Sequence, residues 1–437
     1  MSEAHCMPVG VGFEGGAGAG VCAGVPAGVA HRRARSSWES TDTVSAGCLR
    51  SFARKRSVRF WLQDRLQGLL PRDSRECSCH RVPVKSGASV VLADNGRARY
   101  RGVARCGNVW VCPLCAPVIA VERSKQVGSV LRWGSAEGFS FLKLTFTCRH
   151  ARGDGLLDLM DKQVKALRSF KASRPVRRIR ESVGYLDSVT AKEATWGPSS
   201  GWHPHQHEYW MCNLGDVDLG DVDLGAIAKE LELEWLKALR RQGLDGAAGV
   251  ALHLGKMKAD EVNTGAATGY LTKSGTAAGY LTKSGTAAAL ELVGGVGKQG
   301  KKGHKQGHYT QMELLSLGED WADKLFLEFY LAFKNRKQLT FGRLILKAYR
   351  DLFGTVPGDD FEVVKQNDKE KPGEVRVINL EPRQLWVLRK TNQAVQVLEL
   401  VESGLVSEAV MLVERVWESW NRDRYLEAVS YVSHLWG

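Results

Sequence analysis

The sequence predicts an α+β protein built on a central antiparallel sheet flanked by helices. Within residues 138–350, short runs rich in β-branched and aromatic residues alternate with segments that repeat apolar residues at helical spacing. Cysteines gather in a separate segment ahead of this region, and apolar residues at helical spacing follow it. We therefore expect one mixed domain with a smaller unit on either side of it.

The 437 residues are enough for about two to four structural units. Residues 1–75 read as a mostly disordered leader, rich in Gly and Ala and then in basic residues, with a short helix near Phe60 to Leu70. The other predicted units are a cysteine-rich segment at 76–130, the sheet domain at 131–355 and a helical C-terminal region at 356–437.

Five segments of the sheet domain carry its predicted elements. Phe139 to Thr147 and His203 to Asn213 read as strands. Gly155 to Ser173 and Leu224 to Gln242 read as amphipathic helices, because their apolar residues recur every three or four positions. A short apolar run follows at Val250 to Leu254. Strands and helices of this kind fit a sheet with helices packed on it.

The charge of the chain favours an anionic partner. Lys and Arg outnumber Asp and Glu by 61 to 48, which gives a net charge of +13 and a pI of about 9.3. No stretch supplies the roughly 18 consecutive apolar residues of a membrane span. The small-residue run at 10–30 lacks a basic start and has Glu3 and Glu14 near it, unlike a secretion signal. We expect a soluble, cytoplasmic protein without a membrane partner.

Five of the ten cysteines lie between Cys77 and Cys115, and this clustering favours a metal site over disulfides. Cys106, Cys112 and Cys115 have the spacing C-x5-C-x2-C, and a C-x2-C turn brings two thiolates to one ion. We take Cys79 as the fourth zinc ligand, although spacing alone does not separate it from Cys77 or His80. The alternative is a set of reduced, buried thiols.

Three histidines in the segment Trp202-His-Pro-His-Gln-His-Glu-Tyr-Trp210 predict a second metal site. On a strand, alternate side chains share a face, so His203, His205 and His207 point one way. Pro204 restricts the start of the strand, so His205 and His207 are the better placed pair, and His203 either completes the site or hydrogen-bonds beside it. Imidazoles bind several divalent ions, and such an ion could polarise a phosphoryl oxygen.

A ten-residue segment occurs twice, at 269–278 and 279–288, and supplies two candidate nucleophiles. Each copy places a tyrosine three residues before a lysine, as Tyr270 with Lys273 and Tyr280 with Lys283. On a helix each pair shares a face, so the lysine could lower the pKa of the phenol or hold a phosphate beside it. Ten helical residues leave the two tyrosines about 80° apart, so both cannot meet one metal ion. Tyr270 lies nearer the preceding apolar run and is slightly favoured.

Taken together, these segments resemble the rolling-circle replication initiators of bacterial plasmids, in the HUH endonuclease superfamily. The resemblance covers about residues 75–355, and its most specific part is the histidine block. In order along the chain, the matching blocks are Arg105–Ala116, Phe141–His150, Trp202–Trp210, Gly269–Ser274 and, more weakly, Trp321–Phe353.

The resemblance implies both a fold and a reaction. The fold is a five-stranded antiparallel sheet flanked by helices, with Phe141 to Thr147 beside the histidine strand. The reaction is a nick at the plasmid's double-strand origin, in which a tyrosine joins the 5′-phosphate and the freed 3′-hydroxyl primes synthesis. His205 and His207 would bind a divalent ion, Mn or Mg, with His203 as an adjunct. Tyr270 or Tyr280 would attack, and Lys273 or Lys283 would orient the phosphate.

The partners expected from this interpretation are single-stranded or hairpin origin DNA, host helicase and replication proteins, and a second copy in a homodimer. Two other interpretations stay open. One is a relaxase or transposase with the same metal chemistry, although the chain has no G-x-x-x-x-G-K-[ST] motif of an attached helicase. The other is a non-catalytic, zinc-stabilised DNA-binding regulator in which the histidines are structural.

Overall fold

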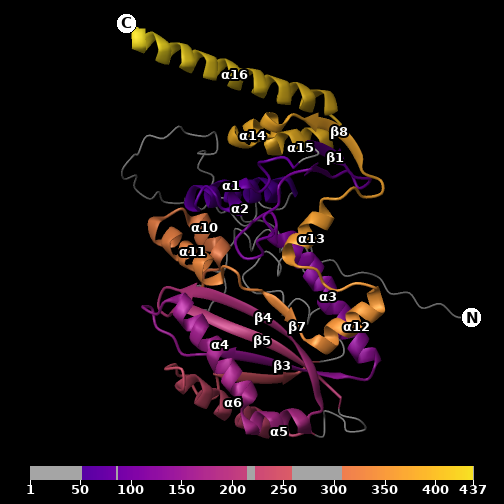
Figure 1. Ribbon diagram of the computed structural model, residues 1–437, viewed down its shortest axis with the longest axis vertical. Coiled ribbons are helices and arrows are strands. Elements are labelled where there is room, and N and C mark those ends of the chain that lie inside the picture. Colours follow the sequence, from indigo (N-terminus) through magenta and orange to yellow (C-terminus); the bar gives the residue numbers. More distant parts are fainter. Residues whose placement is uncertain (1–51, 85–86, 214–221, 258–307, 437) are drawn as a thin grey trace, which may run out of the picture. The chain divides into compact units, whose positions relative to one another are not determined.

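The structure, a computed structural model, describes residues 52–84, 87–213, 222–257 and 308–436 (Figure 1). These residues all belong to one of two units of the chain, residues 42–437. Of the leader expected at residues 1–75, residues 1–51 lie outside the described residues, as does the duplicated tyrosine segment.

A five-stranded antiparallel sheet forms the larger of two sheets in the described residues, and it confirms the predicted α+β class. Its strands, in spatial order, are β6 (Leu252–Lys256), β3 (Ser140–Thr147), β5 (Gly201–Cys212), β4 (Tyr185–Gly197) and β7 (Leu339–Phe341). The histidine strand β5 is therefore central, and its residues 205–212 pair with β3, the strand that the resemblance implied beside it.

Strand β4 has no counterpart among the predicted elements. Its sequence alternates only weakly between apolar and polar residues, and its burial pattern is irregular. It forms a hairpin with β5, because Gly197 and Gly201 are paired at the end of the ladder and only three residues join them. Gly201 has a φ of +75°, and a Cβ there would meet the backbone of Ala151 and Arg152, so this position requires glycine.

Helices α4 (Leu156–Ala172), α5 (Arg174–Ser182) and α6 (Leu224–Arg240) cover one face of this sheet (Figure 1). Their core holds three aromatic rings in edge-to-face contact, from Phe146, Phe170 and Trp235, with centroids 5.2 to 5.9 Å apart. The indole N–H of Trp235 also donates to the Thr147 carbonyl at 2.8 Å. These contacts fix α6 against β3.

At one end, the other face of the sheet is covered by apolar side chains of α3 (Ala116–Ala136) and α12 (Arg343–Phe353). There Tyr209 and Met211 of β5 pack with residues such as Leu131. Because alternate residues share a face, the three histidines of β5 lie on this same face, toward the other end of the strand.

A second antiparallel sheet joins residues that are far apart in sequence. Its order is β2 (Ala98–Arg101), β1 (Ala88–Leu92) and β8 (Val375–Leu380), so a strand from near the C-terminus pairs with the cysteine-rich segment. None of these three strands was predicted, because each has only four to six residues.

The helical character of the C-terminal region is confirmed. Helices α10 (Gln311–Leu317) and α11 (Asp320–Phe333) precede this region in the sequence. The helices within it are α13 (Asp360–Asn367), α14 (Pro382–Lys390), α15 (Ala394–Glu402) and α16 (Val406–Trp436). The short helix expected near Phe60 is longer, since α1 runs over Phe52–Leu69 and is followed by α2 (Arg75–Ser78). Buried Arg56 ties α1 to α15 through its ion pair with Glu402, at 2.5 Å.

None of the helices in the described part of the chain combines the length and the apolar composition needed to cross a membrane.

The aromatic trio predicts a large cost for removing Trp235, which is fully buried. We expect Trp235→Ala to lower the free energy of unfolding by about 3–5 kcal/mol, because it leaves a cavity and removes the bond to Thr147. Leu233→Ala, on the same helix but at a side chain that is 50% exposed, should cost less than about 0.5 kcal/mol. Urea unfolding followed by circular dichroism measures both, and equal costs would contradict the packing described.

Candidate metal centres

Glu193, His205 and His207 form a compact group on one face of the central sheet. Glu193 of β4 and His205 of β5 are direct cross-strand partners, so their side chains lie on the same face. His207 is two residues further along β5 and shares this face. One carboxylate oxygen and two imidazole nitrogens of these residues all lie within 4.8 Å of one another, which is close enough to hold one metal ion.

Hydrogen bonds orient the group. The Nε2 of His205 bonds Glu193 Oε1, and the Nε2 of His207 lies 3.6 Å from the same oxygen. On the other side of its ring, His207 Nδ1 is 3.1 Å from the hydroxyl oxygen of Thr145, on β3. If Nδ1–H donates to Thr145, Nε2 carries the lone pair that a metal ion needs.

The carboxylate of Glu193 is ionised despite its burial. Burial alone would raise the pKa of Glu193, but the neighbouring imidazoles of His205 and His207 outweigh it, and this pKa lies well below its ordinary value. The group therefore offers one negative charge and two imidazoles, a set of donors that suits a divalent transition metal.

His203 lies beside this group and not within it. Its Nδ1 is hydrogen-bonded to Nε2 of His150, and Nδ1 of His150 donates to the carbonyl oxygen of Ser200 at 2.8 Å. Burial, together with the nearby rings of His205, His150 and His308, lowers the pKa of His203 to about 3. His203 is thus neutral, and if its Nδ1–H points at His150, its Nε2 is an acceptor.

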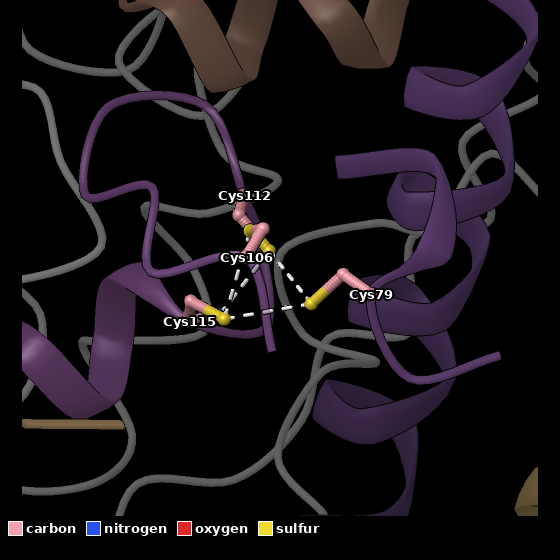
Figure 2. Close-up of side chains that lie close together, drawn as sticks. All are labelled: Cys79, Cys106, Cys112 and Cys115. Carbon is pink, nitrogen blue, oxygen red and sulfur yellow. Dashed lines mark hydrogen bonds between the residues drawn. The ribbon is translucent and has the colours of Figure 1, made fainter. Parts of the chain in front are cut away.

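Four buried cysteines form the second group (Figure 2). The sulfur of Cys79 lies 3.7 Å from that of Cys112 and 3.5 Å from that of Cys115, and the sulfurs of Cys106 and Cys115 are 3.8 Å apart. All four are free thiols within 4.8 Å of one another. They enclose a point that one metal ion could occupy.

Backbone amides point at these sulfurs. The N–H of Asn108 donates to Cys106 Sγ at 3.4 Å, and the N–H of Cys115 donates to Cys112 Sγ at 3.3 Å. Hydrogen bonds from Cys106, Cys112 and Cys79 lower the pKa of the Cys115 thiol well below its ordinary value, whereas burial raises that of Cys112 well above it. Only a bound cation would favour ionising all four thiols together.

The two other candidates for the fourth ligand bond to other groups and do not belong to the cluster. The thiol of Cys77 contacts the hydroxyl of Ser74 at 3.2 Å and the carbonyl of Pro71 at 3.3 Å. His80, at a φ of +57°, bonds the guanidinium of Arg105 through Nε2. Of the three upstream candidates, the structure brings Cys79 to the cluster.

Both candidate nucleophiles, Tyr270 and Tyr280, with Lys273 and Lys283, lie outside the described residues. The described residues stop at Met257, before this segment, and resume at His308, after it.

The point of return is next to the histidine group. Tyr309 is bridged to Trp196 of β4 by two backbone hydrogen bonds of 2.7 and 2.9 Å. The ring of His308 lies 6.1 Å from that of His203. The chain is therefore held beside the candidate metal site at the point where the described residues resume.

Sequence reasoning missed Glu193 and His150. A signal for Glu193 exists: a tight hairpin closed by Gly197 and Gly201 fixes the register, and this register sets Glu193 opposite His205. His150 follows β3 by three residues and had no periodic pattern to mark it.

The cysteine group predicts a retained metal ion. We expect elemental analysis of the gel-filtered protein to find one ion per chain that Cys112→Ser loses, with a fall in melting temperature, because binding stabilises the folded state. Cys77→Ser is the matched control and should keep the ion. Equal metal content in the two variants would contradict the four-cysteine site.

Comparison with known proteins finds similarity over part of the chain. The chain is 32% identical to Protein rep of Streptomyces lividans, in a match that covers 28% of this chain and 32% of that protein. It is 30% identical to the neomycin resistance protein of Streptomyces cyanogenus, over 28% of this chain and 33% of that protein. The chain spans about a third of the length of these curated relatives.

No protein-family model matches the sequence, and no solved structure matches it either. The chain is thus distantly similar, over part of its length, to a Rep protein.

Proposed function

We propose that this protein initiates plasmid replication by nicking one strand of the origin DNA. The observation that carries the proposal is the group of Glu193, His205 and His207 on adjacent strands of a five-stranded antiparallel sheet. The partial similarity to Protein rep supports it. The net charge of +13 suits a nucleic-acid partner. In this proposal the partner is origin DNA that is single-stranded or extruded as a hairpin.

A divalent ion, manganese or magnesium, would be held by Glu193, His205 and His207. Bound there, it would polarise a phosphoryl oxygen of the scissile phosphate. Two imidazoles with one carboxylate fit manganese better than magnesium, which proteins hold mainly through oxygen ligands. We therefore expect manganese to support the faster nicking.

The chain's own residues supply orientation around this group. Thr145 holds the ring of His207 through its Nδ1. His150, itself held by the carbonyl of Ser200, fixes the ring of His203 on the same face of the sheet. Neutral His203 then presents an acceptor nitrogen to a bound DNA strand or to an ordered water.

The nucleophile in this proposal is Tyr270 or Tyr280. Its phenol oxygen attacks phosphorus and loses its proton, the bond from phosphorus to the 3′ oxygen breaks, and that oxygen takes up a proton to become the 3′-hydroxyl. The protein remains joined to the 5′-phosphate, and Lys273 or Lys283 orients the phosphate. The anchoring of His308 and Tyr309 beside the histidines supports a tyrosine segment that reaches this site.

Zinc is the ion that we propose for the four cysteines. A tetrahedron of sulfurs at about 2.3 Å from zinc has edges of about 3.8 Å. The three sulfur separations of 3.5, 3.7 and 3.8 Å are close to this value. The zinc would have a structural role, since four cysteines leave no open coordination position. Host helicase, replication proteins and a second copy of the chain are further partners in this proposal.

Incubation of the protein with an origin strand and manganese should give a covalent adduct at the 5′-phosphate of the nick. Mass spectrometry of the digested adduct identifies the modified tyrosine, and the double variant Tyr270→Phe, Tyr280→Phe should give none. Glu193→Ala and His205→Ala should lower the nicking rate at least about 100-fold, because loss of even an outer partner of a metal site costs about 10- to 100-fold.

Glu230→Ala is the matched control for Glu193→Ala, since Glu230 is an exposed carboxylate on α6. It should nick at the wild-type rate. Cleavage without a protein adduct would contradict the tyrosine mechanism. If no variant or condition gave cleavage, and His205→Ala weakened origin binding instead, the protein would be a DNA-binding regulator.

A further inference from the structure

A groove of about 470 Å³ lies among α14, α16 and the segment at 81–83, and none of the residues that line it belongs to either metal group. Its volume is within the range of about 300–1,000 Å³ that is usual for ligand sites. We call it the tryptophan groove. It is lined by Arg81, Val82, Pro83, Pro382, Arg383, Trp386, Val387, Trp417, Trp420, Asn421 and Arg424.

Three tryptophans give the groove its aromatic surface. Trp386 of α14 is 38% exposed, and its ring meets that of Trp420 of α16 edge to face, with centroids 5.4 Å apart. Trp417, Trp420, Asn421 and Arg424 follow one another at spacings of three, one and three residues, so they share one face of α16. Trp417 and Trp420 are half-buried, and an exposed indole such as that of Trp386 beside them is typical of a binding surface.

Three arginines give the groove its charge, and its lining includes no carboxylate. The guanidinium of Arg81 is fixed by Asp64 at 2.5 Å, and Asp64 also pairs with buried Arg389 at 2.9 Å. Arg383 and Arg424 are exposed at the groove. The groove therefore combines flat aromatic faces with a positive charge that favours an anionic ligand.

We propose that the tryptophan groove binds single-stranded DNA, with bases stacked on Trp386 and Trp420 and phosphates held by Arg383 and Arg424. Bases expose their faces only in a single strand, and aromatic residues among basic ones are the usual means of binding such strands without sequence preference. A duplex would offer the arginines its phosphates and leave the indoles unused. An apolar peptide would leave the arginines without a counter-charge.

The proposal rests on the proposed function for its biological role, because nicking at an origin releases a single strand. The binding itself requires neither metal ion nor tyrosine. It should persist in chelator and in His205→Ala, so the failure of one proposal is distinguishable from the failure of the other.

The test is fluorescence anisotropy of the full-length protein with a labelled 15-nucleotide oligo-thymidine in EDTA. We expect tighter binding than to a duplex of the same length. Trp386→Ala should raise the Kd about tenfold, the change expected when one base no longer stacks on an indole. The double variant Arg383→Glu, Arg424→Glu should also weaken binding. In a plot of the logarithm of the binding constant against the logarithm of the salt concentration, its slope should be shallower by about 0.7 for each phosphate that the protein no longer neutralises.

Arg132→Glu, a charge reversal at an exposed position of α3, is the matched control and should bind like the wild type. Ultraviolet crosslinking of an iodouridine-substituted strand should attach it to peptides that contain Trp386 or Trp420. Unchanged affinity in both groove variants would overturn the proposal, as would crosslinks confined to other peptides. Near-equal binding of single strand and duplex would also count against it.

Discussion

The register of the hairpin between β4 and β5 is the constraint on which the candidate catalytic site depends. With Gly197 paired to Gly201, the residues of β4 from Asp187 onward have fixed partners on β5, and Glu193 stands opposite His205. A slip of one residue would turn Glu193 to the other face of the sheet, because strand side chains alternate. The carboxylate and the two imidazoles would then not meet.

Packing on the opposite face of the sheet holds this register. There Glu208, the neighbour of His207, is fully buried and accepts bonds of 2.8 Å from Lys171 of α4 and from the hydroxyl of Ser188 on β4. A buried carboxylate is costly unless it is paired, so these contacts specify one alignment of β4, β5 and α4. The same pairing of β4 with β5 therefore places Glu208 against Lys171 on one face of the sheet and Glu193 against His205 on the other.

Much of the site could be predicted from the sequence, since its strongest signals are local. Period-two histidines need only a strand to share a face, and the C-x2-C spacing needs only a turn. Glu193 could not be found this way, because its place depends on a partner strand with little alternation of its own. The short strands β1, β2 and β8 depend even more on tertiary pairing, since β8 reaches β1 from almost three hundred residues along the chain.

Pulsed electron paramagnetic resonance of bound Mn²⁺ tests most directly whether an ion sits between these two strands. We predict nitrogen couplings from two imidazoles in the wild type, one of them absent in His205→Ala. In Glu193→Ala we predict both couplings, with affinity weakened by at least about tenfold. Manganese bound without nitrogen couplings, or couplings unchanged in His205→Ala, would contradict the placement of an ion between β4 and β5.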